Sequence, residues 1–117
     1  MNKKLKIYIA GPYTPREAST HDCARVAHQN TQRAIRVGLE VIKKGHYPFI
    51  PHLSHYIHLE TEKDLGEYYM EYDYVWLDLC DALLVLEDSP GVNLEFKRAV
   101  EKGKIIFFRL DEVPTLD

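Results

Sequence analysis

Short apolar runs alternate along the chain with longer segments in which apolar residues recur every three or four positions. Residues 82–86 and 105–108 are continuously apolar, which is typical of strands covered on both faces. Residues 5–10 and 46–50 also read as strands, and Pro48 indicates that the second of these ends quickly. The pattern therefore predicts four strands.

Three helices are predicted between these strands. The first begins at His21 or Asp22 and stops before Gly45, and the second covers about residues 64–80. The third has Ser89 as N-cap and ends at Gly103. Its inward positions are Val92, Glu95, Phe96, Ala99 and Val100.

Strands that alternate with helices predict an α/β fold with parallel strands and right-handed crossovers. We expect one domain over residues 1–117, doubly wound in the flavodoxin or Rossmann manner, with four or five strands and helices on both faces. Ligands in such folds bind at the carboxyl ends of the strands. Three segments meet there: the loops after Ala10 and Ile50, and residues 87–91. The segment 51–63 has no clear pattern and is where a lid or wall is expected.

Composition narrows the possible partners. The chain has 117 residues and a net charge of −3, which argues against binding to nucleic-acid polymers or anionic membranes. It has no apolar stretch near the roughly 20 residues that span a bilayer, and no signal peptide is apparent. Cys23 and Cys80 form no metal motif, so we expect reduced thiols and a cytoplasmic protein.

Two acids fall on the apolar stripes of their helices, Asp73 on the second and Glu95 on the third. Burying a carboxylate costs several kcal/mol unless it is paired or used. One interpretation is that Glu95 is exposed or pairs with Arg98 or Arg109, and that Asp73 bonds a backbone amide or a tyrosine. The other is a site that breaks or makes a bond at an acetal-like carbon.

Further candidates surround these acids. Ser89 caps a helix, and the free amides at a helix start also bind phosphate. Tyr8 and Tyr13 flank the first loop and can wall a pocket for a flat ring, whereas the tyrosines of the second helix favour core or subunit contacts. His52, His55 and His58 lack the pattern of a zinc site, and a solvated loop or one histidine touching substrate is favoured.

In combination, these residues resemble the nucleoside 2-deoxyribosyltransferase superfamily, including its deoxynucleoside 5′-monophosphate N-glycosidases. The resemblance rests on residues 6–11, on Asp73 eight positions before Asp81, and on Ser89 six before Glu95. It implies that Glu95 is the nucleophile at C1′, that Asp73 protonates the leaving base, and that Tyr8 orients Glu95. By the same resemblance Ser89 binds the 5′-phosphate, and glycines at positions 11 and 91 (Gly11, Gly91) allow close approach. Asp81 has at most a supporting role.

The resemblance implies a small-molecule substrate, no cofactor or metal, and a homodimer or higher homo-oligomer. Hydrolysis of a nucleoside 5′-monophosphate is favoured over base exchange on free nucleosides through Ser89 alone. A nucleotide sensor without turnover is a third possibility, and a cytokinin-type phosphoribohydrolase is a more distant one. The loop at residues 12–16 replaces the glycine-rich loop of the glycosidases, so Thr14 or Arg16 would have to supply its phosphate contacts.

Overall fold

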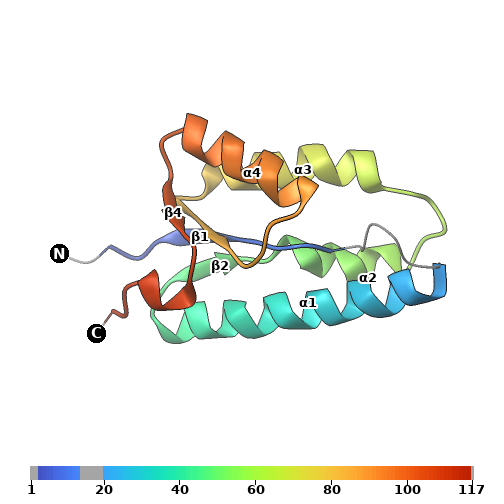
Figure 1. Ribbon diagram of the computed structural model, residues 1–117, viewed down its shortest axis with the longest axis horizontal. Helices are drawn as coiled ribbons and strands as arrows, with labels where there is room; N and C mark the ends of the chain where they lie inside the picture. Colours follow the sequence, from blue (N-terminus) through green and yellow to red (C-terminus); the bar gives the residue numbers. More distant parts are fainter. Residues whose placement is uncertain (1–2, 14–19, 117) are drawn as a thin grey trace.

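The computed structural model describes residues 3–13 and 20–116 and contains a four-stranded parallel sheet with helices on both faces (Figure 1). The α/β doubly wound fold predicted from the sequence is confirmed. The elements, in chain order, are β1 (Lys6–Ala10), α1 (Thr20–Lys43), β2 (Tyr47–Phe49), η1 (Pro51–Leu53), α2 (Ser54–His58), α3 (Gly66–Leu79), β3 (Ala82–Val85), α4 (Pro90–Glu101), β4 (Ile105–Phe107) and η2 (Leu110–Glu112).

The strands lie in the order β2-β1-β3-β4, and every pairing between them is parallel. β1 and β3 are central, and both are apolar on both faces. β2 is an edge strand, which explains how it accommodates Pro48, a residue that cannot donate to a ladder. The chain leaves β1 toward β2 and leaves β3 toward β4, so the connections reverse between the two central strands.

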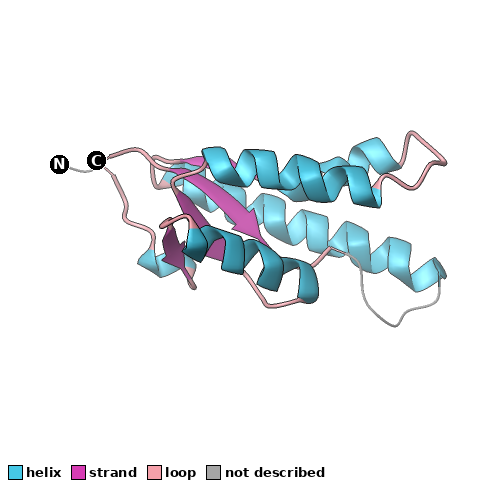
Figure 2. Cartoon of the chain, turned by 90° about the horizontal axis from the view of Figure 1, so that it is seen from above, coloured by secondary structure: helices cyan, strands magenta, loops and turns pink. Residues whose placement is uncertain are grey.

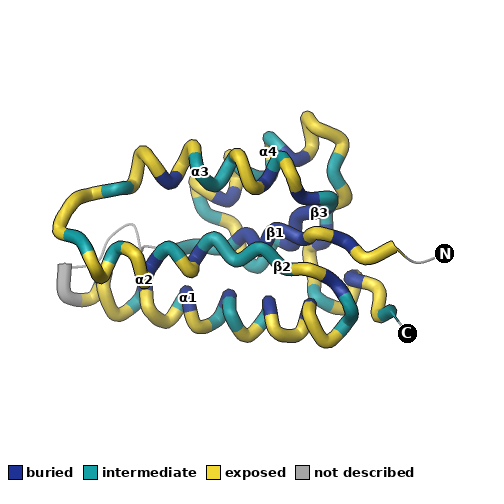
Figure 3. The backbone as a smooth tube through the Cα atoms, turned by 180° about the vertical axis from the view of Figure 1, so that it is seen from behind, coloured by how far each residue is buried: buried dark blue, intermediate teal, exposed yellow. Residues whose placement is uncertain are grey.

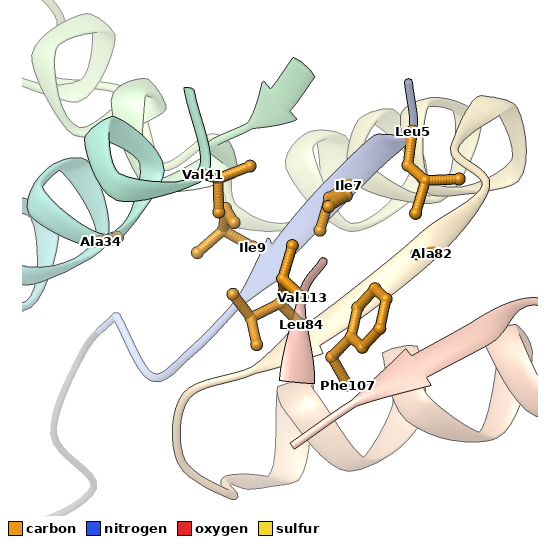
Figure 4. Packing of buried hydrophobic residues seen from close by; sticks show 9 residues of the cluster. All are labelled: Leu5, Ile7, Ile9, Ala34, Val41, Ala82, Leu84, Phe107 and Val113. Carbon is orange, nitrogen blue, oxygen red and sulfur yellow. The ribbon is translucent and has the colours of Figure 1, made fainter. Parts of the chain in front are cut away.

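One face of the sheet packs on α1. Ile7 and Ile9 of β1 point to this side, where they meet Ala34 and Val41 of α1 (Figure 4). Val113, just after η2, closes the same cluster. The buried positions follow the inner side of α1 along its length (Figure 3).

The opposite face packs on α3 and α4. Tyr8 and Ala10 alternate with the isoleucines of β1 and point to this second side. They meet Leu77 of α3 and Val92 of α4 there. Ser89 caps α4 as predicted, because its Oγ accepts a hydrogen bond from the Val92 amide at 3.2 Å. The expectation that Val100 points inward was wrong, since its side chain is 52% exposed.

The helices extend beyond the carboxyl ends of the strands (Figure 2). The segment without a clear sequence pattern contains η1 and the short helix α2, which follow β2 directly. α2 lies beside α1 and is connected to α3 by residues 59–65 (Figure 1). Within the described part of the chain, no helix is long and apolar enough to cross a membrane.

Candidate functional site

A cavity of about 990 Å³ opens at the carboxyl ends of the central strands. Its walls come from the loop after β1, from η1 and α2, from the first half of α3, and from the start of α4. This is the point at which the chain connections reverse, and doubly wound folds bind their ligands at such points.

Glu95 is held in this cavity by a hydrogen bond from the hydroxyl of Tyr8. Tyr8 is fully buried in β1, and its ring stacks on Phe49 of β2 at 5.6 Å between centroids. Burial raises the pKa of Tyr8, and the charge of Glu95 raises it further, so the hydroxyl keeps its proton and donates it. The two residues are 87 positions apart in the sequence, and the sheet brings them together.

Asp73 enters the same cavity from α3. It lies one helical turn after Tyr69, and both side chains line the cavity. Its Oδ1 atom is buried and has no hydrogen-bond partner among the described residues. Among the described residues, neither a backbone amide nor a tyrosine hydroxyl therefore bonds Oδ1 of Asp73.

The two acids have similarly raised pKa values and differ in their hydrogen bonding. Burial raises the pKa of Asp73 to about 7. Burial also raises the pKa of Glu95 to about 7, where the hydrogen bond from Tyr8 opposes the rise and the charge of Asp73 adds to it. Of the two acids, Glu95 accepts a hydrogen bond from Tyr8, and this donor favours the ionised form of Glu95. The site thus favours a carboxylate at Glu95 near neutral pH.

Both acids should destabilise the folded protein at alkaline pH. Their folded pKa values lie above the unfolded values near 4, so the native state binds more protons between pH 4 and 7 and loses stability as the pH rises. We expect Asp73→Asn to stabilise the protein relative to the wild type more at pH 8 than at pH 4. The gain in free energy of unfolding should be larger at pH 8 by on the order of 1–3 kcal/mol. Denaturant unfolding at both pH values measures this difference.

The matched control is Glu71→Gln, on an exposed position of the same helix. It should change stability equally at pH 4 and pH 8. If Asp73→Asn increased the free energy of unfolding equally at both pH values, burial would not raise the pKa of Asp73.

The loops at the mouth bring glycines and a helix start to the cavity. A Cβ atom at Gly11 would lie 3.2 Å from Leu86, so the loop after β1 packs tightly on the end of β3. A Cβ atom at Gly91 would meet no protein atom within 4 Å, which leaves the first turn of α4 open. Ser89 lines the cavity beside it.

Four rings form a continuous aromatic wall of the cavity, and they come from the loop after β1, from η1, from α2 and from α3. Tyr13 contacts His52 and His58, with centroids 6.3 and 6.0 Å away, and His58 contacts Tyr69 at 5.2 Å. Tyr13 was predicted from the sequence to line a pocket. The sequence did not indicate that Tyr69, His52 and His58 line it too. Tyr69 could have been predicted, because it lies one helical turn before Asp73 and therefore on the same face of the helix.

Asp81 is not brought to this cavity. It precedes β3 at the opposite edge of the sheet, where its carboxylate accepts a hydrogen bond from the Lys6 amide at 2.9 Å. Its role there is to tie the starts of β1 and β3 together. The sequence motif therefore gave a wrong position for Asp81. A residue that precedes a parallel strand lies at the amino end of the sheet, whereas the cavity lies at the carboxyl end.

The proposed alternative partners of Glu95 are engaged elsewhere. Arg98 binds Asp78 with two hydrogen bonds of 2.8 and 2.6 Å, and Arg109 pairs with Asp111 at 3.2 Å. Thr14 and Arg16, the suggested phosphate contacts, lie outside the described residues. Across residues 3–13 and 20–116, no group of three or more His, Cys, Asp or Glu side chains is placed to hold a metal ion.

Fold and cavity together define the class of the protein. It is a doubly wound α/β domain in which two partly buried acidic residues line a cavity at the reversal point of the sheet. The chain belongs to the family described as Domain of unknown function (DUF7768), which matches residues 5–109. No curated protein matches it. The matched span includes every residue that lines the cavity.

Proposed function

We propose that the protein hydrolyses the N-glycosidic bond of a nucleoside 5′-monophosphate through a covalent glycosyl-glutamate intermediate. The observation that carries this proposal is the unequal hydrogen bonding of the two acids. Glu95 accepts a hydrogen bond from Tyr8, whereas Oδ1 of Asp73 has no hydrogen-bond partner among the described residues. Retaining glycosidases need one carboxylate near the reacting carbon and one acid near the leaving group.

In the first step, a carboxylate oxygen of Glu95 attacks C1′ of the sugar. The bond from C1′ to the base nitrogen breaks, and the proton of Asp73 passes to the departing base. The hydrogen bond from Tyr8 favours the ionised form of Glu95 and fixes the position of its carboxylate. This step leaves a sugar ester on Glu95 and a carboxylate at Asp73.

In the second step, the Asp73 carboxylate takes a proton from a water molecule. The resulting oxygen attacks C1′ and breaks the ester, which releases the sugar phosphate and restores the carboxylate of Glu95. Both acids return to their starting protonation states. A raised pKa at Asp73 suits a group that first gives and then takes a proton near neutral pH.

The start of α4 supports a phosphate at the far end of the substrate. The first-turn amides of a helix favour anions, and Gly91 leaves this turn accessible. Lys63 is the one lysine or arginine among the described residues that line the cavity. Ser89 presents its hydroxyl at the same place.

Ser89 variants test the phosphate assignment. We expect Ser89→Asn, which keeps a capping side chain, to raise the KM for monophosphates about tenfold and to leave the KM for nucleosides unchanged. Steady-state kinetics on both substrate series measure this.

Ser89→Ala removes the cap as well, and thermal unfolding of both variants separates the loss of the cap from the loss of phosphate binding. An equal rise in KM for monophosphates and nucleosides would refute the phosphate contact.

One observation favours base exchange on free nucleosides as a second candidate. Glu87 and Asp88 also line the mouth beside Ser89, and acidic side chains disfavour a phosphate. Arg33 offsets part of this charge by pairing with Glu87 at 3.0 Å. Chromatography of reactions with and without an added second base separates the two activities, because only exchange requires the acceptor.

The cellular compartment and the oligomeric state are also part of the proposal. Cys80 is a buried free thiol, which is compatible with a reducing cytoplasm. A homodimer or larger assembly stays a prediction. Its best support is the outer side of α3, where Tyr68, Val75 and Leu79 are each more than half exposed.

A further inference from the structure

Two buried histidines fasten the segment after β2 to the loop after β1. His52 of η1 is 4% exposed, and His55 of α2 is 5% exposed. They are three positions apart, and each contacts the loop at residues 11–13 through a ring nitrogen. The loop and His52 both line the cavity, so these contacts join two parts of its wall. The proposed reaction gives neither histidine a role.

The bonds of His52 favour a neutral ring. Its Nε2 lies 3.0 Å from the carbonyl oxygen of Gly11 and 3.1 Å from that of Pro12. Carbonyl oxygens only accept hydrogen bonds, so Nε2 carries the proton and donates it. Nδ1 is buried and has no hydrogen-bond partner among the described residues. A second proton would create a charged and unbonded N–H group at this atom, and burial lowers the pKa of His52 accordingly.

The neighbours of His55 also favour its neutral form. Its Nδ1 lies 2.7 Å from the hydroxyl oxygen of Tyr13, and its Nε2 lies 3.3 Å from Nδ1 of His28 on α1. A neutral imidazole has one donor and one acceptor, which suits a hydrogen-bonded chain through the ring. Burial lowers the pKa of His55, and the charges of His28 and His58 lower it further.

The side chains that face His55 come from three elements. Tyr13 belongs to the loop after β1 and His28 to α1, while Tyr56 and His58 belong to α2 itself. Tyrosine is neutral and histidine is neutral or positively charged below about pH 8. None of these four side chains therefore balances a positive charge on His55.

The two histidines hold the wall more strongly at neutral pH than in acid. Their folded pKa values lie below the ordinary histidine value near 6.5, so the opened segment binds more protons than the closed one. Their contribution is fully present above about pH 6.5 and is lost as the pH falls below it. Asp73 and Glu95 act in the opposite direction, because their raised pKa values stabilise the folded protein as the pH falls from 7 to 4.

We propose that His52 and His55 are positioning residues that form an acid-sensitive latch on one wall of the cavity. At neutral pH they hold η1 and α2 against the loop after β1. In acid, each takes up a proton from the solvent, and the segment at residues 51–58 opens. The loop stays in place, because the carbonyl oxygen of Tyr13 accepts a hydrogen bond from Asn30 of α1 at 2.9 Å. The latch does not depend on the proposed reaction or on any particular ligand.

Hydrogen exchange followed by NMR on the full-length protein tests the latch, because protection factors measure local opening. Between pH 7.5 and pH 5.0, we expect protection to fall for the bonded amides of Leu53, Leu59 and Glu60, and to persist in β1 and β3. One proton taken up on opening lowers the protection by at most about tenfold per pH unit, and two protons by at most about a hundredfold. The wild-type slope should exceed that of one proton.

Two variants identify the titrating groups. Glutamine has a donor and an acceptor but does not titrate, so His52→Gln and His55→Gln should each reduce the slope to one proton or less. The matched control is His46→Gln, which should keep the wild-type slope. His46 is 3% exposed but precedes β2 at the amino end of the sheet, where its Nδ1 accepts from the Leu5 amide at 3.0 Å. Thermal unfolding verifies that each variant is folded.

Three results would overturn the latch. Protection that does not change with pH in this segment would show that the closed form tolerates both protons. Equal losses of protection in β1 and β3 would show that acid unfolds the whole domain instead. A wild-type slope that survives in both glutamine variants would assign the proton uptake to other groups. If one variant did not fold, the slope of the other would still decide between these results.

Discussion

Glu95→Gln should lose at least 10³-fold in the rate of base release, because the amide is not a nucleophile and no covalent intermediate forms. Substrate binding should persist, since glutamine has nearly the same shape and can still accept the hydrogen bond from Tyr8. Single-turnover kinetics measure the chemical step, and calorimetry measures binding. In acid-quenched wild-type reactions, mass spectrometry should find the sugar phosphate on the peptide that contains Glu95.

The matched control is Glu101→Gln, an exposed glutamate at the end of the same helix. It should cleave as fast as the wild type. If Glu95→Gln retained most of the wild-type rate, Glu95 would not be the nucleophile, and the retaining mechanism would have to be abandoned.

Asp73→Asn should lower the rate on natural bases by roughly 10²- to 10⁴-fold, the usual contribution of a general acid. The loss should shrink for substrates whose leaving group departs without protonation, because the first step then no longer needs the acid. Comparing kcat/KM for natural bases with that for activated leaving groups therefore identifies what Asp73 does. The wild-type pH profile should also show the ionisations of both acids near pH 7, whereas the profile of Asp73→Asn should keep that of Glu95 alone.

Glu71→Gln serves again as the control on α3 and should leave both substrate series unchanged. If Asp73→Asn lost the same factor on natural and activated substrates, Asp73 would be a binding or structural residue. The stability gain expected at pH 8 would then be its main measurable effect.

Much of the fold could be predicted because the central strand β3 is apolar without interruption and the central strand β1 is apolar after Lys6. A strand that is covered on both faces needs helices on both sides, and the alternation of elements leaves a parallel sheet as the solution. Pro48 was compatible with a strand because β2 is at the edge. Segment 51–63 was not predictable, because α2 is only five residues long and too short to show a helical period.

The candidate site was predictable where the sequence places a charge among apolar neighbours. Asp73 and Glu95 stood out for this reason, and both line the cavity. Their difference was not visible in the sequence, because it depends on Tyr8, which reaches Glu95 only after the sheet has formed.

Which of His52, His55 and His58 line the cavity was not predictable for a similar reason, and His52 is an example. Its orientation depends on carbonyl oxygens 40 and 41 residues away in the sequence. Asp81 was wrongly predicted to lie at the site. It matches the sequence motif, but it lies at the edge of the sheet opposite the cavity.

The central claim is that the acids of this cavity cleave an N-glycosidic bond, and detection of released base tests it most directly. Wild-type protein and Glu95→Gln would each be incubated with ribo- and deoxynucleoside 5′-monophosphates and with the matching nucleosides. Chromatography should show free base and sugar phosphate from the wild type on at least one monophosphate, and none from the variant. Intact substrates throughout, even when they bind the wild-type protein, would contradict the claim and favour a sensor without turnover.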